Sequence, residues 1–102
     1  MYTTLISVAQ LQEMMRLNQP LRVFDCSFEL MKPGAGDAQF EETRIATAVR
    51  ADLEQHLSAT KGAPDAASAG RHPLPSRQKF AQWVGSVGLT PDMQAVVYDR
   101  QG

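Results

Sequence analysis

Cysteine, net charge and long apolar runs are all scarce in this 102-residue sequence. The single cysteine, Cys26, excludes a disulfide within the chain and is typical of a reducing compartment, so we expect a cytoplasmic protein. Ten basic and eleven acidic residues leave a net charge of −1, which predicts neither nucleic-acid nor membrane binding. No apolar run approaches the roughly 18 residues that span a bilayer. The composition is that of one modest globular domain.

Residues that form a recognised metal or cofactor site are also missing. His56 and His72 lack the spacing of a metal pair, and one cysteine with two scattered histidines does not predict a zinc site. The stretch Gly34-Ala35-Gly36 lacks the helix start that a phosphate-binding loop requires. We therefore predict no metal and no cofactor, and the motifs alone complete no catalytic set.

Two amphipathic helices are predicted. The first runs from about Val8 to Leu17, begins with a capping box between Ser7 and Gln10, and ends at Asn18 before Pro20. The second follows Ser76 and ends before Gly88. Its apolar positions recur at the helical spacing i, i+3, i+4 and i+7, namely Phe80, Trp83, Val84 and Val87.

Short apolar runs predict the strands. Leu21 to Phe28 has almost no polar face, which is typical of a strand covered on both sides. Ile45 to Leu53 is expected to form a strand around Ala48 and Val49, and Ala95 to Tyr98 another, with a brief strand possible at Leu5-Ile6. Met31 to Ala38 is expected to be loop, Phe40 to Ile45 a helical turn, and Glu54 to Pro75 a surface excursion. Helices that separate apolar strands favour an α/β fold with a mostly parallel sheet flanked by helices.

Three residues near the strand ends are candidates for chemistry. Asp25 and Asp99 lie where buried strands emerge, so they either converge on one crevice or accept hydrogen bonds from neighbouring loop N–H groups. Cys26 lies inside an apolar strand with no cationic neighbour in the sequence, which favours a structural role over that of a nucleophile.

Three segments carry a resemblance to a known family. The first is 23–27 (VFDCS), the second is 44–49 (RIATAV) followed by 51–53 (ADL), and the third is 72–76 (HPLPS) with the helix after it and 96–99 (VVYD). In order and spacing they resemble the amino-terminal half of the two-domain rhodanese-type sulfurtransferases, the thiosulfate and 3-mercaptopyruvate group. The resemblance spans about Leu5 to Gly102. It implies that residues 1–102 form a partial amino-terminal rhodanese-like domain, incomplete at its C-terminal end.

The departures from the family pattern bear on the chemistry. Arg44 stands where the family usually has a histidine, and Ala46-Thr47 stand where it has Pro-Gly. An arginine cannot be deprotonated to act as a base. In the family the active cysteine lies in a second domain, so the resemblance implies that Cys26 is not the nucleophile. It also implies that the strand at Leu21–Cys26 lies between those at Ala48–Val49 and Val96–Tyr98.

The resemblance implies a function for the parent protein. That protein would move a sulfane sulfur from thiosulfate or 3-mercaptopyruvate to cyanide or a thiol, and this chain would be a supporting domain, inactive alone. Arg44, Asp99 and Arg100 would lie on the side of the domain interface as binding residues. The C-terminal rhodanese domain or another chain would cover the strand at Ala95–Asp99. One alternative is a non-catalytic rhodanese-like module that binds an anion with Arg44 and Arg100. Another is an unrelated small α/β domain, which the strand order distinguishes.

Overall fold

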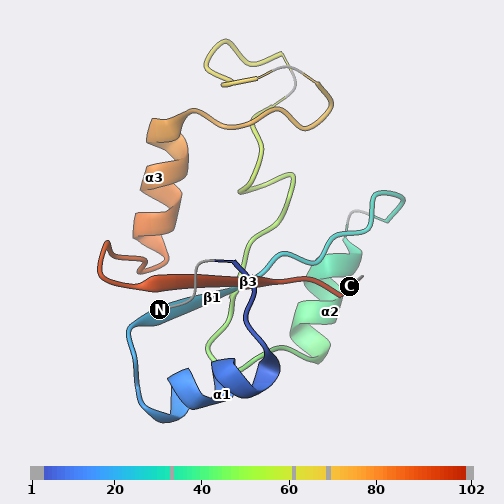
Figure 1. Cartoon of the computed structure of the whole chain (residues 1–102). Helices are drawn as coiled ribbons and strands as arrows, with labels where there is room; N and C mark the ends of the chain where they lie inside the picture. The colour runs from blue at the N-terminus through green and yellow to red at the C-terminus, as the bar shows by residue number, and fades with distance from the viewer. Residues whose placement is uncertain (1–3, 33, 61, 69, 101–102) are drawn as a thin grey trace.

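The computed structural model describes residues 4–32, 34–60, 62–68 and 70–100. Helices and strands alternate along these residues (Figure 1). In chain order they are α1 (Val8–Arg16), β1 (Leu21–Asp25), α2 (Ala35–Glu42), β2 (Val49–Arg50), α3 (Arg77–Ser86) and β3 (Gln94–Tyr98).

The three strands form one parallel sheet in the order β2-β1-β3. Phe24 of the central strand lies opposite Val49 of β2 and Val97 of β3. This order confirms the expected position of the 21–26 strand between the other two, and an α/β fold with a parallel sheet. Because parallel strands share a direction, the carboxyl ends of all three meet at one edge of the sheet.

The helices cover the two faces of the sheet unequally. In Figure 1, α1 and α2 lie on one side and α3 on the other. On the α1 side, Leu11, Val23 and Val96 form the buried core. On the α3 side, Phe24 contacts Trp83 with ring centroids 5.8 Å apart, but α3 has no buried residue and Phe80 is 39% exposed. The face under α3 is therefore only partly covered.

The first helix is capped as its sequence predicts. The Ser7 hydroxyl accepts a hydrogen bond from the Gln10 N–H, and the Gln10 side chain accepts one from the Ser7 N–H. Asn18 has a left-handed backbone with φ 54° just beyond the helix. The expected strand at Leu5-Ile6 does not form, because no neighbouring strand pairs with these residues in the described part of the chain.

Three expected boundaries are wrong. The strand predicted to reach Phe28 ends at Asp25, because the Ser27 N–H donates to the Asp25 carboxylate instead of a neighbouring strand. The strand predicted over 45–53 is only Val49–Arg50. The loop predicted over 31–38 gives way to α2 from Ala35. A Cβ at Gly36 would lie 2.0 Å from Arg50 Nη2 and 2.3 Å from the Ser27 carbonyl, so this glycine permits close packing rather than a turn.

Thr47 holds a backbone conformation that β-branched residues rarely adopt. Its φ is 66°, in the left-handed region, in the turn before β2. This is the position at which the resemblance implied a glycine. Thr47 therefore occupies a backbone conformation that glycine fits best.

Replacing Thr47 with glycine should stabilise the protein. Relief of left-handed strain, about 1–2 kcal/mol, exceeds the extra chain entropy of glycine, about 0.5–1 kcal/mol, so we expect a gain of roughly 0.5–1 kcal/mol in the free energy of unfolding. Urea denaturation measures it. The control is Thr43→Gly, where φ is −152° and glycine relieves nothing, so stability should fall. Equal losses at both positions would contradict the strain at Thr47.

Candidate functional site

The candidate site is built around the carboxylate of Asp25, the last residue of the central strand. This side chain is fully buried, with 0% exposure. Its Oδ1 accepts a hydrogen bond from the Ser27 N–H at 2.9 Å. Its Oδ2 accepts from the Tyr98 hydroxyl at 3.0 Å and from Arg100 Nη2 at 2.9 Å. A buried charge needs such partners, because burying it unpaired costs several kcal/mol.

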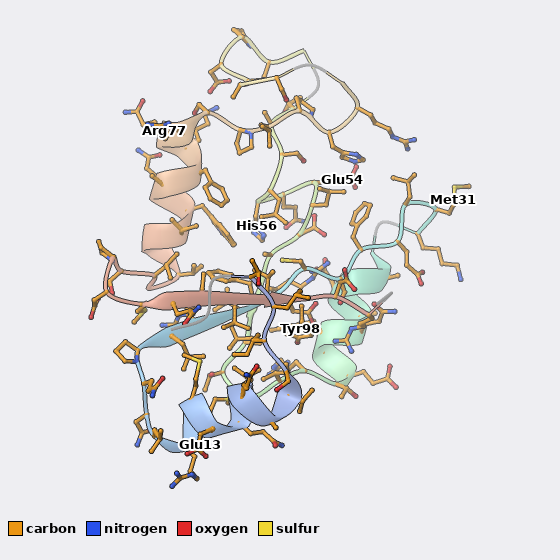
Figure 2. The ribbon with its side chains drawn as sticks, viewed as in Figure 1. Glu13, Met31, Glu54, His56, Arg77 and Tyr98 are labelled. Carbon is orange, nitrogen blue, oxygen red and sulfur yellow. The ribbon has the colours of Figure 1, made fainter. Side chains whose placement is uncertain are left out.

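Tyr98 and Arg100 connect this carboxylate to the neighbouring loop and helix. The Tyr98 hydroxyl also accepts a hydrogen bond from the Ile45 N–H at 3.3 Å. Figure 2 shows Tyr98 at the carboxyl end of β3, beside α2. Arg100 Nη2 donates in addition to the carbonyls of Gln39 and Thr43 at the end of α2. The end of β3 is therefore held to both β1 and α2.

Arg50, at the end of β2, completes the cluster from the other side. Its guanidinium donates to the carbonyls of Asp25 at 2.8 Å and Ser27 at 2.5 Å. It also pairs with the carboxylates of Asp37 at 3.0 Å and Asp52 at 3.3 Å, and its side chain is only 11% exposed. The carboxyl ends of all three strands are thus linked by charged side chains.

These contacts shift the pKa values of Asp25 and Tyr98, the two groups at the centre of the cluster. Burial alone would raise the pKa of Asp25, but hydrogen bonds from Ser27 and Tyr98 and the charge of Arg100 together lower it. Burial and the adjacent Asp25 carboxylate raise the pKa of Tyr98. At neutral pH the site therefore contains an ionised Asp25 and a protonated Tyr98.

Cys26 points away from this cluster. It is half-buried and, with Phe24, Trp83 and Val97, lines an apolar cavity of about 200 Å³ between the sheet and α3. Burial, and then the nearby Asp25 carboxylate, raise the pKa of its thiol. A nucleophilic cysteine needs a lowered pKa, so this environment disfavours the reactive thiolate.

The remaining expected site residues lie close to the cluster without forming its centre. Arg44 is exposed, lies over the Phe40 ring at 4.5 Å and donates to the Phe40 carbonyl at 3.1 Å. Asp99 is exposed between Tyr98 and Arg100. The role of Arg44, Asp99 and Arg100 at a domain interface stays a prediction.

Sequence reasoning missed several members of this network. Arg50, the Tyr98 hydroxyl and Gly36 were not singled out, because a residue type at a strand end does not reveal which side chains converge from segments 25 to 75 residues apart. One sequence feature could have indicated a role for Arg50. It is a single arginine directly after an apolar stretch and two residues before Asp52.

The described residues contain no group of three or more histidine, cysteine or acidic side chains that could hold a metal ion. None of their helices is long and apolar enough to cross a lipid bilayer.

Removing the Arg100 charge should destabilise the protein. Arg100→Gln leaves the buried Asp25 carboxylate short of a cationic partner, and because Arg100 is partly exposed we expect a loss of about 2 kcal/mol in the free energy of unfolding. The matched control is Arg16→Gln, which breaks the exposed ion pair with Glu13 and should leave the urea midpoint unchanged. Equal midpoints for the two variants would show that the Arg100–Asp25 pair does not support the fold.

The chain is similar to sulfurtransferases in sequence. It is 42% identical over 87 residues to the "Probable 3-mercaptopyruvate sulfurtransferase" of Pseudomonas aeruginosa, a match that covers 82% of this chain and 29% of that protein. It is 35% identical over 104 residues to the thiosulfate sulfurtransferase of Bos taurus, covering 97% of this chain and 32% of that protein. The chain thus spans about a third or less of the length of these curated relatives. No protein-family model matches it.

The fold is similar to a solved sulfurtransferase structure. The 3-mercaptopyruvate sulfurtransferase from Leishmania major matches with a TM-score of 0.68 and 28% sequence identity, over 86% of this chain and 23% of that one. Sequence and fold point to the same group of proteins. The chain is therefore a homologue of the rhodanese-type sulfurtransferases and has a rhodanese-like α/β fold.

Proposed function

We propose that this chain is part of the non-catalytic, amino-terminal domain of a cytoplasmic sulfurtransferase. In the reaction, a thiolate attacks the sulfane sulfur of thiosulfate and displaces sulfite, or attacks the sulfur of 3-mercaptopyruvate and displaces the enolate of pyruvate, which takes up a proton. Either step leaves a persulfide. Cyanide or a thiol then takes the outer sulfur of the persulfide and the thiolate is restored. The names of the relatives support this reaction class. The single cysteine also suits a reducing compartment.

The environment of Cys26 is the observation that carries the supporting role. The reaction needs an accessible thiolate with a lowered pKa. The one cysteine of the chain instead faces an apolar cavity beside Phe24 and Trp83, and its pKa is raised by burial and by Asp25. A second domain would supply the nucleophile, and this chain would supply a surface for it.

The carboxyl edge of the sheet would form that surface. Arg100 fixes the end of β3 to Asp25 and to the end of α2, so Asp99 is presented on an immobilised segment. Because the ligands of α/β proteins bind at this edge, the second domain's active loop would approach from here. The cluster acts by positioning and contributes no nucleophile.

The exposed apolar surface would be covered by further parts of the protein. Val97 of β3 is 64% exposed, and Ala95 and Val97 line the apolar cavity together with Trp83 and Leu89. β3 is also an edge strand in the described sheet. An exposed apolar edge tends to associate. The C-terminal rhodanese domain or another chain would pair with the strand at Ala95–Asp99.

The alternative, an anion-binding module that uses Arg44 and Arg100, is less well supported. Arg100 Nη2 donates to the Asp25 carboxylate and to two carbonyls, so much of its donor capacity is committed within the domain. Adding thiosulfate or sulfate to crystals tests it, because an anion that bridges the two arginines would favour this module.

The 102-residue chain should show no sulfurtransferase activity. We expect no thiocyanate to form from thiosulfate, or from 3-mercaptopyruvate, and cyanide above the rate without protein, because the only thiol disfavours its thiolate form. The full-length Pseudomonas aeruginosa relative, assayed in parallel, is the positive control for the conditions. Thiocyanate formation that Cys26→Ser abolishes would overturn the supporting role.

A further inference from the structure

His56 lies in the long loop between β2 and α3 and is not part of the Asp25 cluster. Its N–H donates to the Asp52 carbonyl at 2.9 Å, which starts a turn directly after β2. Its imidazole Nδ1 accepts a hydrogen bond from the Asp52 N–H, also at 2.9 Å. A ring nitrogen that accepts a hydrogen bond carries no proton, so the structure requires the neutral imidazole with its proton on Nε2.

The same imidazole ring connects the loop to α3. It stacks on the indole of Trp83 with ring centroids 4.6 Å apart and the planes inclined by 14°. Trp83 in turn contacts Phe24 of the central strand, with centroids 5.8 Å apart. Figure 2 shows His56 in the space between the loop and α3. Because α3 has no buried residue, this stack helps to fix the helix against the loop.

We propose that His56 is a pH-sensitive latch that holds the 51–76 loop against α3 at neutral pH and releases it in mild acid. Protonation puts a hydrogen on Nδ1, where it faces the Asp52 N–H, so two donors would meet at a distance that fits one hydrogen bond. The ring must then turn or leave, which disturbs its stack on Trp83. The latch goes beyond the proposed sulfurtransferase role.

Some of the charged groups around His56 raise its pKa and others lower it. Asp52 and Asp37 favour the imidazolium, whereas burial and Arg50 disfavour it. Burial is the largest of these effects, so the pKa of His56 is lowered. His56 and Trp83 line a surface hollow of about 240 Å³. Glu54 and the Lys79–Asp65 ion pair line it too.

The sign of the pH effect follows from this direction. Because the folded protein holds the pKa of His56 below its unfolded value of about 6.5, the latch contributes its full stability above that pH. The contribution is lost progressively as the pH falls below about 6.5, through the lowered pKa of the folded state.

Trp83, the only tryptophan in the chain, reports directly on the latch. The emission maximum of the chain should move to longer wavelength, with a midpoint below about pH 6.5, while the helical circular dichroism is retained. In His56→Asn, the amide oxygen can accept the hydrogen bond from the Asp52 N–H but does not titrate. The pH-dependent shift of the emission maximum should therefore disappear. His72→Asn is the matched control and should keep it.

A second measurement covers the case in which His56→Asn does not fold. The imidazole nitrogen shifts of the unaltered chain at pH 7.5 should show a proton on Nε2 and none on Nδ1 of His56. A proton on Nδ1, an emission maximum that does not change between pH 7.5 and 5, or a transition that persists in folded His56→Asn would each overturn the latch.

Discussion

The ionised carboxylate of Asp25 is the group on which the rest of this structure depends. It is fully buried at the end of the central strand, and groups from the ends of all three strands offset the cost of that burial. Tyr98 and Arg100 come from the end of β3, and Arg50 comes from β2. Removing water from a charge is unfavourable by several kcal/mol, so the arrangement of these donors is constrained.

The carboxyl edge of the sheet is cross-linked by charged side chains, whereas the face under α3 is only partly covered. Arg100 holds the end of β3 to α2, and Arg50 holds β2 to the Ser27 carbonyl, which leaves no room for a side chain at Gly36. The α3 side has apolar contacts with Trp83 at their centre, and Val97 remains exposed. This contrast between the polar edge and the apolar face motivates the supporting role proposed above.

Features that depend on neighbouring residues were predictable from the sequence, whereas contacts between distant segments were not. The capping box of Ser7 and Gln10 and the left-handed Asn18 depend on neighbours within four residues, so their pattern is visible in the sequence. The strand order was predictable only through the family resemblance. The start of the helix at Ala35–Glu42 was missed because Gly34 and Gly36 indicate a turn, whereas Gly36 is required by Arg50, fourteen residues away. The hydrogen bond from Arg100 to Asp25 spans 75 residues, and no local pattern encodes it.

Titration of the Asp25 carboxyl carbon by NMR tests most directly whether this carboxylate organises the strand ends. We expect a midpoint below the ordinary aspartate value of about 3.9, because Ser27, Tyr98 and Arg100 together outweigh the effect of burial. Stability from Asp25 should then be present above about pH 3.9 and be lost as the pH falls through the lowered value. A midpoint at or above about 3.9 would show that burial dominates and that the carboxylate does not organise the strand ends.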